Sequence, residues 1–433
     1  MHDGFLKGKI ITTVSQTDLS HSQRIATEAG QKFDITSILA PMKFSGGEFN
    51  PMHVLLKDLH SRGFNFDPAQ AYKGLTVYII KTAGPFKEPE EMISRVGKTA
   101  YSFKYEYGAE KVIVVATDLD NGRAERGPNE DEAQIGYMNA VRQMAHTWKG
   151  NGVDQVLAMH VHNPKIMEIF QKEFGNPHHE VLVNVSPVYI YADYLMRFSR
   201  LQMDGKLDNG GKDVVFLALD KGSYPMVKEL SDIMALPKSR IVRFKKARAV
   251  PNDANRLHVD LEEPYEEGIL EGKDIITLDD IIDTGGTRIK VNQWIEQDYE
   301  QKHLGKPRAY HDIFTHAVLA GQSFVDTQRR ISQEMPKLRE IILSNSRPYI
   351  DDHVDYHKFK TMTTIIRTAK IFGDIIRSGL LTAASIRDRH KDLYKQGMLH
   401  KNIYDIKRSS SFDSSIEAVP EGFIRQLSVD WER

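Results

Sequence analysis

The residues best suited to chemistry lie in one string, Asp274-Ile-Ile-Thr-Leu-Asp-Asp-Ile-Ile-Asp-Thr-Gly-Gly-Thr287. Its apolar beginning predicts a buried strand over Asp274–Leu278, which ends directly before two carboxylates. Asp279 and Asp280 can accept hydrogen bonds from sugar hydroxyls or hold a metal ion through water. The string therefore predicts a strand that delivers two acidic side chains to a polar ligand.

A short loop follows and opens a predicted helix. Gly285 and Gly286 let the backbone turn tightly and present its N–H groups, and we expect a positive φ at Gly286. Thr284 and Thr287 add hydroxyl donors, and Asp283 can orient the backbone at the loop entry. Because the positive end of a helix dipole lies behind it, this loop suits a phosphate monoester.

Repeated strand and helix patterns must position this loop. The predicted strands are Lys9–Thr13, Thr76–Lys81, Lys111–Thr117, Gln155–Val161, Asp213–Leu219, Arg240–Arg243, Asp274–Leu278, Ile313–Leu319 and Arg339–Leu343. Amphipathic segments between them include Asp131–Lys149, Pro164–Phe174, Met226–Met234 and Arg288–Gln297. Such alternation predicts βαβ units around mainly parallel sheets, and the number of strands favours two sheets in two domains.

The domain boundary is expected near Asn184–Tyr189, where Val-Ser-Pro interrupts the pattern. One long helix is predicted over Lys360–Ser378, because Ile365, Ala369, Phe372 and Ile376 would share a face. Beyond Asp388 the chain is charged and then Ser-rich, which is typical of a tail. The expected division is 1–186, 187–350, a returning helix within 351–387, and a tail over 388–433.

Composition narrows the function classes. The chain has 433 residues, and its 58 Lys and Arg against 59 Asp and Glu give a net charge of −1. This balance disfavours a general nucleic-acid binder, and the absence of cysteine excludes disulfides and thiolate chemistry. No apolar run approaches the length of a membrane span, and the N-terminus lacks a signal-peptide pattern. We expect a cytoplasmic protein that binds neither nucleic acid nor membrane.

The string at 274–287 resembles the phosphoribosyl-binding signature shared by phosphoribosyltransferases and ribose-phosphate pyrophosphokinases, the PRPP synthetases. The pyrophosphokinases are tandem duplications with this signature late in the second copy, and here a full set of strands and helices precedes it. The resemblance extends over about residues 7–387. It implies an α/β protein of two tandem phosphoribosyltransferase-like domains, each a mainly parallel sheet flanked by helices, plus a C-terminal extension.

Three further stretches resemble the ATP side of this family. Lys43-Phe-Ser-Gly-Gly-Glu48 is similar to a Phe-Ser-Asp-Gly-Glu motif, which implies that Phe44 stacks on adenine and Glu48 accepts a hydrogen bond. Asn121-Gly-Arg-Ala-Glu-Arg126 matches a Tyr-Ala-Arg-Gln-Asp-Arg motif, so Arg123 and Arg126 would bind nucleotide phosphates through their bidentate guanidinium groups. Met159-His-Val-His-Asn163 is similar to Met-Asp-Leu-His-Ala, so His162 would help to place Mg-ATP.

Two more stretches resemble the diphosphate and catalytic segments. Ala218-Leu-Asp-Lys-Gly-Ser223 stands where the family has its diphosphate loop, and Asp220 would contact the divalent ion. The remaining residues of that loop are Lys221, Gly222 and Ser223. Arg243-Phe-Lys-Lys-Ala-Arg248 matches a Lys-x-Arg pair after a strand, so Lys246 and Arg248 would stabilise the transferring group, with Lys245 as the alternative lysine.

The resemblance implies transfer of the ATP β,γ-diphosphoryl group to ribose 5-phosphate in nucleotide biosynthesis, with Mg²⁺ as cofactor. The metal contacts would be His162 and Asp220. It also implies a homo-oligomer, at least a dimer, with a hexamer as one candidate form, because Phe44 and Glu48 would reach a neighbouring subunit.

The chain departs from the motifs of this family at Ala124, His160, Lys221 and Ser223, so alternative functions stay open. The first is the same transfer to a larger acceptor such as ADP-ribose. The others are a phosphoribosyltransferase that consumes PRPP, and a non-catalytic regulatory homologue. The chain has no Gly-x4-Gly-Lys-Ser/Thr string, which disfavours a P-loop ATPase.

Overall fold

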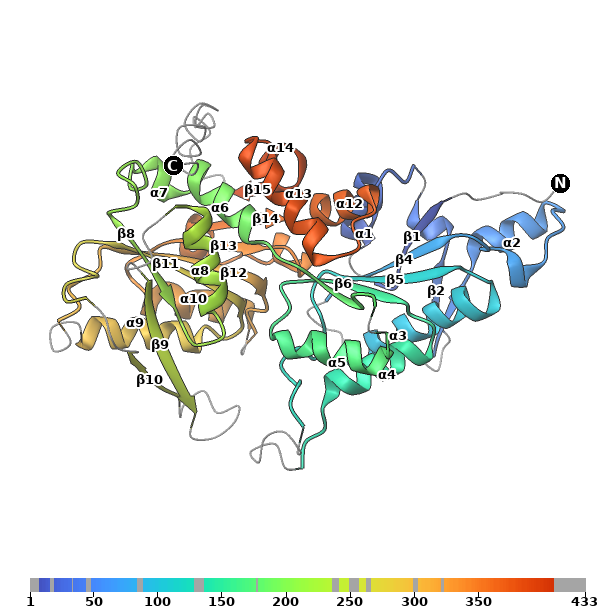
Figure 1. Ribbon diagram of the computed structural model, residues 1–433, viewed down its shortest axis with the longest axis horizontal. Helices are drawn as coiled ribbons and strands as arrows, with labels where there is room; N and C mark the ends of the chain where they lie inside the picture. Colours follow the sequence, from blue (N-terminus) through green and yellow to red (C-terminus); the bar gives the residue numbers. More distant parts are fainter. Residues whose placement is uncertain are drawn as a thin grey trace. The chain divides into compact units, whose positions relative to one another are not determined.

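The computed structural model describes residues 8–15, 19–32, 34–43, 48–83, 89–127, 136–176, 178–235, 241–248, 257–261, 266–298, 303–320 and 323–408. These residues form two compact units (Figure 1). Unit 1 contains the chain up to Ser186 together with Ser346–Pro348 and Thr368–Arg387; unit 2 contains the rest. Each unit is therefore assembled from segments that lie far apart in the sequence.

Unit 1 carries a five-stranded parallel sheet in the order β1-β4-β5-β6-β7 and a separate antiparallel hairpin, β2–β3. The strands are β1 (Lys9–Thr13), β2 (Ala40–Lys43), β3 (Phe49–Met52), β4 (Thr76–Lys81), β5 (Lys111–Ala116), β6 (Gln155–Met159) and β7 (Leu182–Val185). The helices are α1 (Leu19–Glu28), α2 (Val54–Ser61), α3 (Pro89–Tyr101), α4 (Ala140–Gly150), α5 (Pro164–Phe174) and α12 (Ala369–Ser378), with short helices η1 (Ile35–Ser37), η2 (Pro68–Gln70) and η3 (Ser102–Glu106).

Helices cover both faces of this sheet (Figure 1). The neighbouring helices α3, α4 and α5 pack on one face, where Val96, Trp148 and Phe170 join Val77 and Val114 in the core. Helices α1 and α12 pack against each other and belong to the other face. Because both faces are covered, the central strands are continuous apolar runs rather than alternating ones.

Unit 2 carries an eight-stranded sheet in the order β10-β9-β8-β11-β12-β13-β14-β15. Its strands are β8 (Val214–Ala218), β9 (Ile241–Arg248), β10 (Leu257–Leu261), β11 (Asp274–Ile282), β12 (Ala309–Ala317), β13 (Leu338–Ser344), β14 (Thr363–Arg367) and β15 (Asp405–Arg408). Its helices are α6 (Val188–Arg197), α7 (Arg200–Met203), α8 (Tyr224–Ile233), α9 (Gly286–Asp298), α10 (Phe324–Glu334), η7 (Pro348–Asp351), α11 (His357–Met362) and α14 (Leu399–Asn402), and α13 (Ala383–Lys395) spans the change from unit 1 to unit 2.

The inner strands of this second sheet pair in parallel, and only its two edge pairs, β9–β10 and β14–β15, are antiparallel. Helix α8 contacts α6, while α9 and α11 both contact α10, so helices again cover the sheet. The prediction of two mainly parallel sheets flanked by helices is confirmed. Among the described helices, none is both long enough and apolar enough to cross a membrane.

The prediction of one long helix over Lys360–Ser378 is wrong. The β-branched run Thr363–Arg367 is instead strand β14, which pairs in parallel with β13 from Ile341↔Thr363 to Ser344↔Ile366. Ile365 thus belongs to a sheet of unit 2, whereas Ala369, Phe372 and Ile376 lie on α12 in unit 1. Branched side chains fit a pleated strand well, and pairing with β13 stabilises the strand in spite of the helical spacing of the apolar residues.

The expected tail over 388–433 begins too early. Residues up to Arg408 form the end of α13, α14 and β15, and β15 pairs with β14. Buried Asp193 of α6 anchors this segment: its Oδ2 accepts a hydrogen bond from Tyr404 Oη at 2.8 Å and lies 3.4 Å from His400 Nδ1. Arg197 Nε donates to the other carboxylate oxygen at 2.8 Å, so the buried charge is paired. Residues 409–433 lie outside the described part of the chain.

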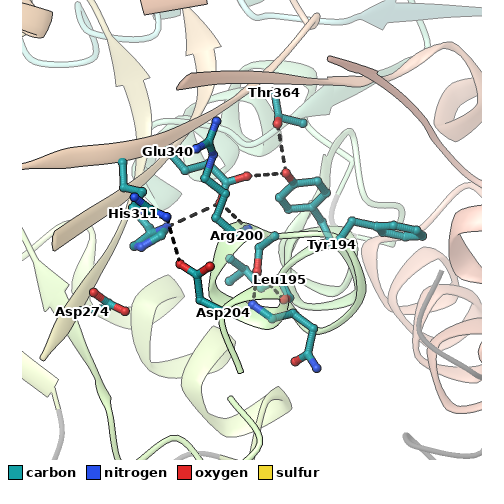
Figure 2. A network of polar contacts seen from close by, with 12 residues as sticks. Tyr194, Leu195, Arg200, Asp204, Asp274, His311, Glu340 and Thr364 are labelled. Atoms are coloured by element: carbon teal, nitrogen blue, oxygen red, sulfur yellow. Dashed lines mark hydrogen bonds and ion pairs between the residues drawn. The ribbon is translucent and has the colours of Figure 1, made fainter. Parts of the chain in front are cut away.

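A buried polar network fixes α6 and α7 to the second sheet (Figure 2). Glu340 of β13 accepts hydrogen bonds from Tyr194 Oη at 2.5 Å and from the Arg200 backbone N–H at 3.0 Å, and His311 Nδ1 of β12 lies 3.5 Å away. Tyr194 also bonds Thr364 of β14, and burial raises the pKa of its hydroxyl well above the ordinary value. His311 and Glu340 lie near the amino ends of their strands, so this network stabilises the edge opposite the predicted phosphate loop.

Candidate active site

Strand β11 carries the two acidic residues of the predicted sugar-phosphate site. It runs to Ile282 rather than ending at Leu278, so Asp279 and Asp280 lie within the strand. Asp279 is half-buried, and its Oδ1 accepts a hydrogen bond from the Asp280 backbone N–H at 3.0 Å. Asp280 is buried. Since successive strand residues face opposite sides, the two carboxylates leave β11 in different directions.

The phosphate loop itself turns at Gly285. This residue has φ +72°, and a Cβ built on it would lie 2.9 Å from Ile331 Cγ1 of α10. The sequence placed the positive φ at Gly286, which is wrong: Gly286 is the first residue of α9. Asp283 and Thr284 form the turn before it, and Thr287 follows in the first helical turn. The loop therefore ends at the positive end of α9, as an anion site requires.

A buried arginine that the sequence did not single out holds this helix end in place. Arg288 Nε donates to Asp312 Oδ2 of β12 at 2.8 Å, and Thr277 Oγ1 of β11 donates to Asp312 Oδ1 at 2.5 Å. The guanidinium carbon also lies 4.6 Å from the ring centroid of Tyr310. Arg288 directly follows Thr287, so this pairing fixes the first turn of α9 against two strands.

The loop after β8 lies at the same edge of the sheet. Asp220 Oδ1 accepts hydrogen bonds from the backbone N–H groups of Gly222 and Ser223 at 2.9 and 3.0 Å, and Ser223 Oγ donates to the Asp220 carbonyl at 3.1 Å. Lys221 is exposed at the tip. These bonds shape the loop before any ligand binds, so Lys221 and Ser223 still belong to a compact turn.

The order of strands explains why the loop after β8 and the loop after β11 lie at the same edge of the sheet. From β8 the chain goes to β9 on one side, and later to β11 on the other. In open α/β sheets, ligands bind outside the carboxyl ends of strands at such a reversal of strand order. Because β8 and β11 pair directly and in parallel, the loops at 219–223 and 283–287 flank that point. Topology thus places both predicted loops where a ligand is expected.

The predicted catalytic pair lies in a longer strand than expected. Strand β9 extends through Arg248 and forms an antiparallel hairpin with β10, in which Lys246 pairs with Val259 and Arg248 with Leu257. Lys246 and Arg248 are therefore within the strand rather than after it. Their side chains, and that of Lys245, lie outside the described part of the structure.

In unit 1, three of the predicted ATP-side residues share one edge of the sheet. Arg123 and Arg126 follow β5 and are exposed, and exposed His162 follows β6. A Cβ built on Gly122 would lie 3.7 Å from His162 Cβ, so the two loops touch. Asn163 Nδ2 also donates to Glu125 Oε1 at 3.1 Å, which links them by a hydrogen bond.

Helix α4 supports residues 121–126, which carry Arg123 and Arg126 and are called the arginine loop below. The backbone N–H groups of Ala140 and Val141 donate to the Ala124 carbonyl, and Asn139 Nδ2 donates to the Glu125 carbonyl at 2.6 Å. Asn139 also caps α4, which begins at Ala140 and not at residue 131. Ala124, which stands in place of the family's Gln, thus contributes its backbone to the loop.

The two remaining ATP-side residues come from the hairpin β2–β3. Lys43 pairs with Phe49, so residues 44–48 connect its strands. Glu48 is exposed, and Phe44 lies outside the described residues.

His160, expected on a strand face, instead follows β6 with φ +44° and donates its backbone N–H to the Val185 carbonyl at 3.1 Å. Such a left-handed backbone is uncommon for histidine and marks a strained strand end.

Comparisons with known proteins place this geometry in a family. Residues 201–301 match the model of the phosphoribosyl transferase domain. Ribose-phosphate pyrophosphokinase of Pyrococcus furiosus is 24% identical over 52% of this chain and 75% of its own length, and that of Oceanobacillus iheyensis is 26% identical over 57% and 63%. The Pyrococcus abyssi enzyme is 28% identical over 56% of this chain and 68% of its own. The chain is a divergent relative of the ribose-phosphate pyrophosphokinases, and it is an enzyme of the ribose-phosphate pyrophosphokinase type.

A solved structure supports the fold over most of this chain. Phosphoribosylpyrophosphate synthetase from Mycobacterium smegmatis aligns with a TM-score of 0.61 at 16% identity, over 86% of this chain and 99% of that one. This chain thus consists mainly of two tandem phosphoribosyltransferase-like domains. Among the residues that the structure describes, no group of three or more His, Asp or Glu side chains could hold a metal ion.

Proposed function

We propose that the protein transfers the β,γ-diphosphoryl group of ATP to the anomeric hydroxyl of ribose 5-phosphate. The hydroxyl oxygen forms a bond to the β-phosphorus, the bond between that phosphorus and the α,β-bridging oxygen breaks, and AMP leaves with the bridging oxygen. The hydroxyl proton passes to solvent. The products are PRPP and AMP.

The observation that carries this proposal is the loop at 283–287, set at the reversal of strand order beside the loop of Asp220. A glycine that tolerates no Cβ, the positive end of α9 and two threonines form a cradle for the 5-phosphate. Asp279 and Asp280, from the end of the preceding strand, are assigned to the ribose hydroxyls, each from its own side of β11. The acceptor is therefore held at both its phosphate and its sugar.

On the donor side, Arg123 and Arg126 bind the nucleotide phosphates, and His162 lies beside them. Phe44 and Glu48 hold the adenine. Lys246 and Arg248 meet the charge that develops on the transferring group, a role in which preorganised cations have their largest effect. Alignment of the hydroxyl with the leaving AMP supplies the remaining requirement for in-line transfer.

The donor set of this chain fits magnesium that arrives with ATP. Mg²⁺ keeps several waters and is usually bound by one or two carboxylates plus substrate phosphates, so a single loop carboxylate such as Asp220 is sufficient. We assign Asp220 of unit 2 as a contact of this ion, and the contact at His162 of unit 1 stays a prediction. When bound, the ion supplies neutralisation of the phosphate charge.

The working form we propose is a cytoplasmic homo-oligomer, at least a dimer. Glu48 is exposed beside its hairpin, as expected of a residue that serves a neighbouring subunit. Sedimentation at micromolar and nanomolar concentrations tests this, with loss of activity expected on dissociation. Full activity of a monomer would contradict it.

Incubation with Mg-ATP and ribose 5-phosphate tests the reaction, with ³¹P NMR to identify products. We expect AMP and a diphosphorylated sugar phosphate in equal amounts, and neither when EDTA removes the metal. Formation of ADP and a phosphomonoester would refute diphosphoryl transfer. Turnover with ADP-ribose in place of ribose 5-phosphate would keep the reaction and change the acceptor.

A further inference from the structure

Lys81, the last residue of β4, is the only lysine whose side chain is buried among those that the structure describes. Its Nζ donates to the Asp118 carbonyl at 2.6 Å and lies 2.8 Å from Asp120 Oδ2. Asp120 is itself buried, and burial raises the pKa of its carboxyl. None of these residues belongs to a motif that the sequence singled out.

A second ion pair completes the cluster. Asp118 Oδ2 accepts from Arg347 Nε at 2.5 Å, and both side chains are largely buried. Arg347 belongs to the short segment of unit 1 that lies 229 residues further along the chain. Two cations therefore hold two carboxylates, and the segment between β5 and the arginine loop is tied to β4 and to a distant segment.

These contacts act on the backbone that leads into the arginine loop. Directly after Asp120, Asn121 has φ +56°, and its carbonyl accepts the Ala124 backbone N–H at 2.8 Å. Arg123 lies inside this turn. Asparagine adopts a left-handed backbone more readily than most residues with a side chain, so Asn121 permits this sharp turn. The lysine fixes the residues on one side of the turn, and α4 fixes those on the other.

Stability alone is a weak reason for such a pair. Replacing a buried ion pair with apolar groups of similar volume is often neutral or stabilising, whereas removing one partner alone is costly. A buried lysine that also binds a backbone carbonyl is better explained by the placement of the loop. We propose that Lys81 is a positioning residue, which with Asp120 holds the loop 118–126 so that Arg123 and Arg126 meet the nucleotide phosphates. This inference rests on the proposed role of that loop in ATP binding.

The test uses Lys81→Met/Asp120→Asn, which removes both charges and nearly preserves the volume of the pair. The chain offers a matched control at the amino edge of the same sheet. There Lys104 Nζ donates to the Glu110 carbonyl at 2.7 Å and to Asp154 Oδ2 at 2.9 Å. Lys104→Met/Asp154→Asn therefore removes the same two kinds of contact from a partly exposed pair, far from the arginine loop.

Two readouts separate positioning from stability. Titration with a non-hydrolysable ATP analogue should show affinity lowered by about 10- to 100-fold in the Lys81 variant, the loss expected when binding groups move by roughly an ångström. Hydrogen exchange of residues 117–127 should be faster in that variant. The control should keep its affinity within about threefold and leave exchange of that loop unchanged. In the AMP assay, KM for ATP should rise while KM for ribose 5-phosphate stays constant.

Unchanged affinity in the Lys81 variant would overturn the inference, as would an equal loss in the control. If the wild-type protein binds no nucleotide, the inference falls with the assigned role of the loop. If it binds the analogue but forms no AMP, the reaction is wrong, and weaker binding by the Lys81 variant would still support the inference.

Discussion

Gly285 lies against Ile331 so closely that a built Cβ would be 2.9 Å from Ile331 Cγ1, and its φ of +72° is left-handed. Gly285→Ala should therefore distort the phosphate loop in two ways, by the contact and by backbone strain of about 1–2 kcal/mol. We expect KM for ribose 5-phosphate to rise at least about tenfold, the equivalent of some 1.4 kcal/mol. Steady-state kinetics on folded protein measure this.

Two further variants separate the causes. Gly285→Ala/Ile331→Ala relieves the contact and keeps the strain, so it should recover only part of the loss. Gly286→Ala, at the first residue of α9, should be mild because that glycine has no positive φ. An unchanged KM for Gly285→Ala would move the phosphate site elsewhere.

Lys246→Ala and Arg248→Ala should each lower kcat by about 10²–10³, the loss typical of one preorganised transition-state donor. The two residues lie two positions apart on β9, and KM for the acceptor should change little. Lys245→Ala is the control and should be mild. A crippled Lys245→Ala would shift the assignment by one residue, and full activity of all three variants would exclude β9 from catalysis.

Asp193 should prove essential for the C-terminal segment. Asp193→Asn leaves buried Arg197 without its carboxylate, which should cost about 3–5 kcal/mol of unfolding free energy. Tyr404→Phe removes one hydrogen bond to Asp193 and should cost about 1 kcal/mol. Urea unfolding measures both. Asp232→Asn breaks the exposed Lys228–Asp232 pair and serves as control, with an expected change below about 0.5 kcal/mol. Equal effects at Asp193 and Asp232 would refute the anchor.

His53 should make unit 1 sensitive to acid. Its Nδ1 lies 3.2 Å from Tyr72 Oη and its Nε2 2.8 Å from Ser102 Oγ, and burial lowers the pKa of its imidazole from 6.5 to about 4. The unfolded chain then binds more protons than the folded one between about pH 4 and 6.5, so stability falls as pH decreases through that window. The stability of unit 1 that depends on neutral His53 should be fully present above about pH 6.5.

The size of this effect is about 3 kcal/mol, from a lowering of the pKa by roughly two and a half units. His53→Gln retains a donor and an acceptor but does not titrate. The difference in unfolding free energy between wild type and His53→Gln should depend on pH between about 4 and 6.5 and be flat above that. A difference that is constant throughout would show that His53 is not buried in its neutral form.

The sequence by itself determined the parallel sheets and the strand–turn–helix that forms the proposed phosphate loop. Both are local signals: apolar runs such as Val112–Ala116 mark strands covered on both faces, and Thr-Gly-Gly-Thr at 284–287 encodes a turn into a helix. The resemblance of the surrounding string to the pyrophosphokinases added the proposed function. Even so, the local pattern assigned the positive φ to the wrong glycine, because only the folded chain shows that α9 begins at Gly286 and that Gly285 makes the turn.

Only the tertiary structure decided where separated segments meet. Residues 363–367 carry a helical spacing and a strand composition, and the open edge of β13 selected the strand. Lys81 gave no signal, since its partner Asp118 lies 37 residues further along the chain, and Arg347, which pairs with Asp118, lies 229 residues beyond that aspartate. Likewise, the charged segment after Asp388 packs because Asp193 pairs with Arg197 and Tyr404. A buried charge is stable only beside its counter-charge, and the fold alone brings the two together.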